Sequence, residues 1–258
     1  MRSSSYGNVL QLLEDLAQRP TKSPRTASKW IKSLIWSTLT VVGGTIVTLG
    51  LSIWVLLGVS LAGSAYYQIH QLDKPSRART LAKAVVTSPL AVMSVLFEAP
   101  ITLTIAFVLS SIVDVVLSYS HSKKYLVAAM AIQSVSLVLY AYTFSMFWVG
   151  FPSLELALLV LGGWGAGLLA VLWSKLDFAR VPVITYMGCV LLMMTVSFGI
   201  DDQHRLAALG AVLFAISTSI HAVEQFHFER PSVLYTYSGP PIWISYYAAM
   251  LSFAFAFV

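Results

Sequence analysis

The first feature that could do chemistry is a lone carboxylate inside an apolar stretch. Asp114 lies in the run from Ile101 to Tyr119, whose other residues are apolar or carry a hydroxyl group. About nineteen residues at 1.5 Å each make a helix of roughly 29 Å, close to the ~30 Å hydrocarbon core of a bilayer. A charge at that depth is costly, so such a residue usually faces a wet cavity and marks a functional site. The alternative is a protonated Asp114 hydrogen-bonded to a neighbouring helix.

A second polar group lies in and just beyond the apolar run 207–223. Ser217, His221 and Glu224 are spaced at i, i+4 and i+7, which places them on one face of a helix. Asp114 and His221 together could serve as an acid/base pair for hydrolysis in a lipid-accessible cavity. The carboxylate would accept a proton from water, and the imidazole would donate one to a leaving oxygen. The alternative for His221 is a simple interfacial position.

Other polar residues inside apolar spans could line the same cavity. They are a lysine at the entrance of its span, two tyrosines and a threonine: Lys83, Tyr140, Tyr186 and Thr218. Hydroxyl groups in such helices commonly bond backbone or a neighbouring helix, so interhelical packing is the alternative, and Gln133 is interpreted in that way. The acidic and histidine residues show no metal-ligand spacing, and the single Cys189 can form no internal disulfide. We therefore predict a site without metal or cofactor.

The composition is that of an integral membrane protein. Of 258 residues, 57% are hydrophobic and only 10% are charged, whereas about a quarter of the residues in soluble domains are charged. Runs of spanning length predict an all-α, polytopic transmembrane helical bundle, because a barrel would show alternating segments of ~10 residues. The net charge of +5 comes from basic residues beside apolar runs, which orient a membrane protein. It does not predict binding to nucleic acid.

Two parts are expected, a polar basic tail over residues 1–32 and the bundle over residues 33–258. The run 33–69 could form one long tilted helix or two short crossings that break near Gly50, so we predict eight or nine helices. With two crossings, Arg205 would be the one basic residue on the outer side of the membrane.

The later spans are simpler to place. We predict crossings over residues 81–97, 101–119, 125–148, 154–173, 181–198, 207–223 and 242–258. Pro89 predicts a kink in the first of these, and Glu98-Ala-Pro100 predicts a tight turn after it. Residues 227–241 are interpreted as a wet loop. The small residues of GGWGAG at 162–167 predict close packing between helices.

Five short signatures follow one another in a characteristic order. They are Ser110-Ser-Ile-Val-Asp114, Leu137-Val-Leu-Tyr140, the run from Val181 to Met194 with its proline, tyrosine and late methionines, Gly210-Ala-Val-Leu-Phe-Ala-Ile-Ser217, and Ser245-Tyr-Tyr-Ala-Ala-Met250. Their order and spacing resemble the YhhN family, the lysoplasmalogenase-like integral membrane proteins. The likeness extends from about Leu51 to Val258.

The resemblance implies about eight transmembrane helices and hydrolysis of the vinyl ether bond of lysoplasmalogens, which yields a fatty aldehyde and a glycerophospho-base. It places Asp114 at the acidic position of the first family motif. We therefore expect a membrane hydrolase acting on a lysophospholipid, with Asp114 and His221 as catalytic residues. Tyr140, Tyr186, Ser217 and Thr218 would line the cavity, and Lys83 would lie near the phosphate.

Three positions depart from the family pattern. Val113 replaces a glycine, Leu137 replaces a histidine, and Thr218 replaces a second acidic residue. The alternative function is therefore an inactive relative that binds or shelters a lipid, and a small-molecule transporter is a third, although no internal repeat favours it. The expected location is the endoplasmic reticulum in a eukaryote or the inner membrane in a bacterium. Oligomeric state is not predicted.

Overall fold

The computed structural model describes residues 50–70, 76–119, 123–151, 154–176, 179–227 and 233–257. The tail predicted over residues 1–32 lies outside these described residues. So does the run 33–49, and with it the choice between one and two crossings before the first described helix. The account below concerns the described part of the chain.

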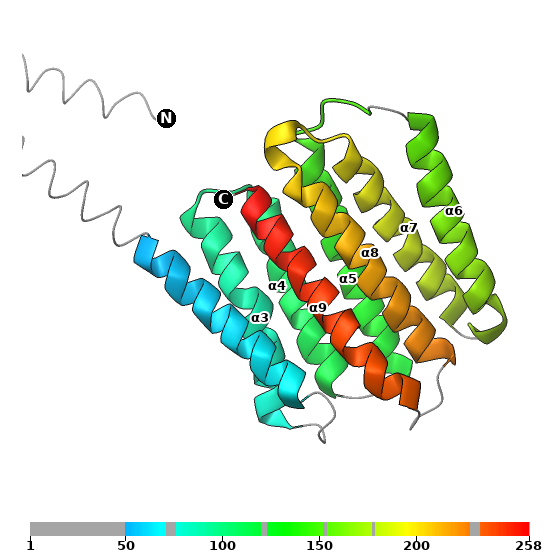
Figure 1. Cartoon of the computed structure of the whole chain (residues 1–258), viewed down its shortest axis with the longest axis horizontal. Helices are drawn as coiled ribbons and strands as arrows, with labels where there is room; N and C mark the ends of the chain where they lie inside the picture. Colours follow the sequence, from blue (N-terminus) through cyan, green and yellow to red (C-terminus); the bar gives the residue numbers. More distant parts are fainter. Residues whose placement is uncertain are drawn as a thin grey trace, which may run out of the picture. The chain divides into compact units, whose positions relative to one another are not determined.

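Helices make up almost all of this part, as Figure 1 shows. One helix runs Gly50–His70, and seven follow it: α3 (Arg77–Leu96), α4 (Ile101–Tyr119), α5 (Lys123–Ser145), α6 (Leu154–Leu172), α7 (Arg180–Phe198), α8 (Leu206–His227) and α9 (Val233–Ala256). Within the described ranges, extended pairing is limited to an isolated bridge between Trp148 and Ile200. The all-α prediction is confirmed.

Six of the described helices are long and apolar enough to cross a membrane, namely Gly50–His70, α3, α4, α5, α7 and α8. Their outward faces carry large apolar side chains, among them Leu81, Ile101 and Val181, which are mostly exposed. Helices satisfy their own backbone hydrogen bonds, so such faces suit hydrocarbon. The chain is a multi-pass membrane protein.

Successive helices run in opposite directions, so their connections gather at two ends (Figure 1). One end, called the basic end below, carries the described cationic residues Arg77, Arg79, Lys83, Lys124, Lys175 and Arg180. The opposite end carries Glu98, Asp201, Asp202 and Arg205. Membrane proteins place such an excess of basic residues on the cytoplasmic side.

Hydroxyl groups join the helices on the α3, α4 and α5 side of the bundle. The shortest contacts are Ser94 Oγ to Thr104 Oγ1 at 2.7 Å, Thr102 Oγ1 to Thr143 Oγ1 at 2.6 Å, and Ser60 Oγ to the Val86 carbonyl at 2.6 Å. Bonds of this kind in membrane bundles contribute roughly 0.6 kcal/mol each. Their number therefore matters more than any single one.

Glycines allow close helix contact at only some of the predicted positions. A Cβ on Gly165 would lie 3.1 Å from the Leu191 side chain, whereas Gly162, Gly163 and Gly167 have open space around them. The predicted seam is therefore confined to Gly165. Among glycines inside the described helices, the tightest approach is between α8 and α9, where a Cβ on Gly210 would lie 2.6 Å from the Phe253 ring.

The start of the last helix differs from the prediction. The interpretation of residues 227–241 as a loop is wrong over residues 233–241, because α9 begins at Val233 and contains Pro240 and Pro241. Each proline lacks the backbone N–H that would bond the carbonyl four residues earlier, a loss that membrane helices tolerate. Ser245 donates to the Pro241 carbonyl at 2.6 Å, and Ser217 of α8 donates to the Ile242 carbonyl at 2.7 Å.

The predicted turn after α3 is confirmed. Glu98 adopts a positive φ of 54°, and the Ala99 amide donates to the Ser94 carbonyl at 2.9 Å. Pro89 lies inside α3, which continues through it to Leu96.

Candidate functional site

A cavity of about 160 Å³ lies between the helices toward the basic end. On the scale of about one water-sized sphere per 10–15 Å³, it has room for on the order of ten water molecules. Most of its lining side chains are apolar. The polar ones are Lys83, Asp114, Gln133, Tyr186, Ser217, Thr218, His221, Gln225, Trp243 and Tyr246, which come from α3, α4, α5, α7, α8 and α9.

Asp114 lies in the wall of this cavity and is only 5% exposed. The hydroxyl group of Tyr246 in α9 donates a hydrogen bond to Asp114 Oδ2 at 3.0 Å. Position 114 is five residues before the last residue of α4, so the carboxyl group lies in the half of the helix toward the basic end. It is buried between helices and does not lie on the lipid-facing surface.

Lys83 supplies a cation at the α3 and α9 side of the cavity. Its Nζ atom lies 4.7 Å from the centroid of the Tyr67 ring and 5.6 Å from that of the Trp243 ring. Both distances are within the range of cation–π attraction. The Trp243 indole is itself held by Ser64, to which it donates at 2.9 Å. These contacts hold the ammonium group beside the cavity, against the rings of Tyr67 and Trp243.

His221 is paired with a buried carboxylate. Its Nδ1 atom lies 3.2 Å from Glu224 Oε2, and Ser238 donates to Glu224 Oε1 at 2.9 Å. The side chain of His221 is 40% exposed, whereas that of Glu224 is 8% exposed. An ionised carboxylate accepts from Nδ1–H, so this pairing leaves Nε2 for exchange of a proton with a ligand. His221 lines the cavity and Glu224 lies behind it.

The hydroxyl groups of α8 are already used within the protein. Thr218 donates to the Phe214 carbonyl at 2.8 Å, so its 3.4 Å contact with Tyr186 is one in which the tyrosine donates. Ser217 donates to the Ile242 carbonyl at 2.7 Å. All three side chains line the cavity, but each of these hydroxyl protons points at a protein oxygen.

Tyr140 is the predicted site residue that the structure does not bring to the cavity lining. It is fully buried in an aromatic cluster, with its ring centroid 4.8 Å from that of Phe253 and 5.7 Å from that of Phe107. Its hydroxyl lies 3.5 Å from Ser110 Oγ. The other predicted site residues, Asp114, His221, Lys83, Tyr186, Ser217 and Thr218, share the cavity.

Several cavity residues were not predicted as site residues. Tyr246, Trp243 and Gln225 were not singled out, and Gln133 was interpreted as an interhelical contact. Trp243 and Tyr246 are spaced at i, i+3 on one face of α9, within the predicted crossing over residues 242–258, but neither spacing nor residue type marked them as site residues. Among the described residues no group of three metal-ligating side chains occurs.

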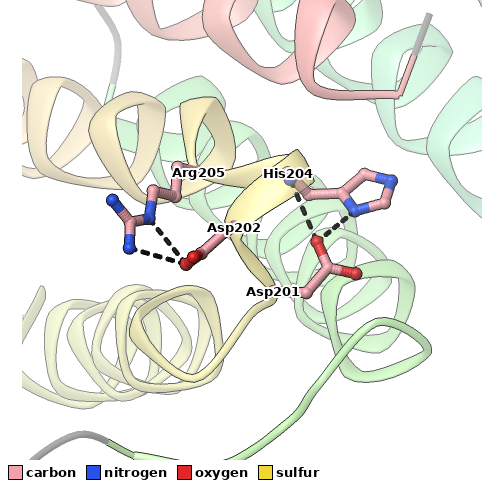
Figure 2. Close-up of polar contacts among 4 residues, drawn as sticks. All are labelled: Asp201, Asp202, His204 and Arg205. Atoms are coloured by element: carbon pink, nitrogen blue, oxygen red, sulfur yellow. Dashed lines mark hydrogen bonds and ion pairs between the residues drawn. The ribbon is translucent and has the colours of Figure 1, made fainter.

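A second histidine–carboxylate pair lies at the opposite end of the bundle, in the turn between α7 and α8 (Figure 2). Asp201 Oδ1 accepts from the His204 backbone at 3.0 Å and lies 2.6 Å from His204 Nδ1. This hydrogen bonding holds the pKa of Asp201 below its ordinary value. The His204 ring packs against Phe147 and Phe257. The cluster closes a turn and adjoins no part of the cavity lining.

Comparison with known proteins identifies one family. The family model of the YhhN family matches residues 74–257, which include α3 to α9. The match begins later than residue 51, where the resemblance was expected to start. No match was found among curated proteins or among solved structures.

Proposed function

The chain belongs to the YhhN family, and from this premise we propose that its cavity hydrolyses the vinyl ether bond of lysoplasmalogens. One observation carries the proposal. Asp114 is a buried carboxyl group, hydrogen-bonded by Tyr246, in the wall of a mostly apolar cavity that also contains His221. A buried, oriented carboxyl group and an imidazole that line one cavity are the groups that acid/base hydrolysis needs.

The cavity lining suits a lipid with one chain. Met130, Leu168 and Phe226 offer apolar surface to an alkenyl chain, and Lys83 offers a cation to a phosphate group. The aromatic rings of Tyr67 and Trp243 hold the Lys83 ammonium in place. We place the protein in the endoplasmic reticulum if it is eukaryotic and in the inner membrane if it is bacterial.

The first step that we propose is protonation of the double bond. Protonated His221 donates a proton to the alkene carbon farther from the ether oxygen, and the neighbouring carbon becomes part of an oxocarbenium ion. Glu224 acts as a positioning residue, since its Oε2 atom lies 3.2 Å from His221 Nδ1 and orients the imidazole ring. The cation forms next to Asp114, whose negative charge stabilises it.

Water completes the reaction in two further steps. A water molecule adds to the oxocarbenium carbon and loses one proton to Asp114, which gives a hemiacetal. Asp114 then returns that proton to the glycerol oxygen as the C–O bond breaks, and His221 takes the hydroxyl proton of the hemiacetal. The products are an aldehyde and a free glycerol hydroxyl, and both residues recover their starting protonation states.

The departures from the family pattern agree with the assignment of proton transfer to His221 and Asp114. Thr218 occupies the second acidic position and donates its proton to the Phe214 carbonyl, so it supplies no acid. Leu137, at the histidine position, is fully buried. We therefore assign His221, which lines the same cavity, as the group that acts with Asp114.

Release of aldehyde by the purified chain in detergent, supplied with a lysoplasmalogen, tests the proposal. Asp114→Asn keeps the shape of the side chain but cannot exchange protons, so we expect the rate to fall by about 10²- to 10⁴-fold. Asp202→Asn makes the same change on an exposed residue at the opposite end and should leave the rate unchanged. No release by the wild-type chain, or equal rates for wild type and Asp114→Asn, would remove the proposed reaction.

The second candidate is an inactive relative that binds a lysolipid. Thr218 favours it, because the family pattern has a carboxylate at that position. In this case the wild-type chain would bind lysolipid without releasing aldehyde, and Asp114→Asn would bind it equally well.

A further inference from the structure

The orientation of the Gln133 side chain follows from a series of hydrogen bonds between hydroxyl groups of α4 and α5. Ser136 donates its proton to the Ala106 carbonyl at 2.9 Å. Ser110, 3.0 Å from Ser136, must therefore donate in that contact. Since its single proton is used in this way, Ser110 can only accept from Gln133, whose Nε2 atom lies 3.5 Å away.

The amide oxygen of Gln133 is consequently presented as an acceptor. Its Oε1 atom is buried and, among the described residues, has no hydrogen-bond donor. The side chain is 5% exposed and lines the cavity. A buried amide oxygen without a donor destabilises the protein, whereas a ligand that brings a donor removes the penalty.

Asp114 lines the same cavity as this acceptor. Ser110 and Asp114 are one helical turn apart on α4, and the Gln133 amide donates to Ser110, so Gln133 meets the face of α4 that carries Asp114. The nearby hydroxyl protons of Ser217 and Thr218 point at backbone carbonyls. This part of the cavity therefore offers acceptors, and its ligand must supply the proton.

We propose that Gln133 Oε1, together with Asp114, binds an O–H group, which makes Gln133 a specificity-determining residue. The inference rests on the proposed function for the identity of the ligand. Two sources carry the same chemistry: the free glycerol hydroxyl of a lysolipid, and the water that attacks the oxocarbenium carbon. The first would explain selection of a one-chain lipid, because a second chain removes that hydroxyl.

Binding of a 1-alkyl lysolipid, whose saturated ether cannot be hydrolysed by this chemistry, separates the inference from the proposed reaction. Calorimetry compares the lipid with a free 2-hydroxyl against its 2-methoxy analogue, using the full chain in detergent. We expect the wild-type chain to bind the hydroxyl lipid about tenfold more tightly. Gln133→Met keeps the length of the side chain without the acceptor and should abolish the preference, while Gln133→Glu should retain it.

The matched control is Gln203→Met, the same change on an exposed residue at the opposite end, which should keep the wild-type preference. Ser110→Ala serves where Gln133→Met fails to fold. It releases the Gln133 amide to rotate, so the preference should weaken although no cavity-lining atom is removed.

The water source gives a different result. The wild-type chain would then bind both alkyl lipids equally, and Gln133→Met would slow aldehyde release from a lysoplasmalogen about tenfold. The inference is overturned if Gln133→Met, or Ser110→Ala in its place, alters neither the lipid preference nor the rate. A wild-type chain that binds neither lipid also overturns it. Absence of aldehyde release combined with a Gln133-dependent preference would remove the proposed reaction and keep the hydroxyl site.

Discussion

Each end of the bundle contains a histidine–carboxylate pair, and the two pairs have different surroundings. At the basic end His221 pairs with Glu224 at 3.2 Å, and at the opposite end His204 pairs with Asp201 at 2.6 Å, both at i, i+3. The first pair adjoins the cavity that contains Asp114. The second packs against Phe147 and Phe257 and closes a turn. We therefore interpret a histidine–carboxylate pair as a candidate catalytic group only where a cavity lies beside it.

Replacing each histidine is the strongest way to break this comparison. His221→Gln removes the proton donor of the cavity, so we expect aldehyde release to fall by about 10²-fold or more, with the melting temperature little changed. His204→Gln removes a ring packed on two phenylalanines and should lower the melting temperature while the rate stays near wild type. Rate and thermal unfolding in detergent measure both effects. The comparison fails if the two variants lose activity to the same extent.

Packing at the α8–α9 contact should affect stability alone. In Gly210→Ala the new methyl group would lie 2.6 Å from the buried Phe253 ring, so we expect a loss of about 1–3 kcal/mol, seen as a lower melting temperature. Gly188→Ala is the control, since open space surrounds that position in α7 and alanine is the better helix former. An unchanged melting temperature for Gly210→Ala would show that α9 can move away from α8.

Replacing Lys83 tests whether the cation at the basic end binds the substrate. Lys83→Met keeps most of the apolar stem but removes the cation beside the cavity, so we expect a rise of about tenfold in KM with a smaller change in kcat. Steady-state kinetics on a lysoplasmalogen measures this split. A fall in kcat at constant KM would instead assign Lys83 to the chemical step.

The smallest expected effect is the pH dependence of the opposite end. Hydrogen bonding to His204 lowers the pKa of Asp201 from its ordinary 3.8, so the stabilisation is complete above that value and is lost as the pH falls through the lower folded pKa. As the pH is lowered below about 4, the melting temperature of Asp201→Asn should thus fall less steeply than that of wild type. Identical pH profiles would show that the pair contributes nothing to stability.

Features of the fold that depend on hydropathy can be predicted from the sequence. Features that depend on contacts between helices cannot. The range of α4, Ile101–Tyr119, is predicted correctly because apolar residues fill it between a proline and a polar loop. The start of α9 is not, because Gly239, Pro240 and Pro241 are typical of a turn, whereas α9 continues through them.

The candidate site shows the same division. The burial of Asp114 follows from the cost of a charge in hydrocarbon, but its donor, Tyr246, comes from a helix more than a hundred positions away, and no local pattern indicates it. Tyr140 shares a helix face with Gln133, at i+7, yet it lies two turns farther from the basic end and packs into the aromatic core. Helical periodicity gives the face of a residue and not its depth relative to a cavity.

A structure of the full chain bound to a 1-alkyl lysolipid with a free 2-hydroxyl tests the central claim most directly. We predict that the ether oxygen lies beside Asp114, with the phosphate near Lys83 and the chain along the apolar cavity wall. A lipid found only on the outer apolar faces, with side chains filling the space around Asp114, would contradict the assignment of this cavity as the hydrolytic site.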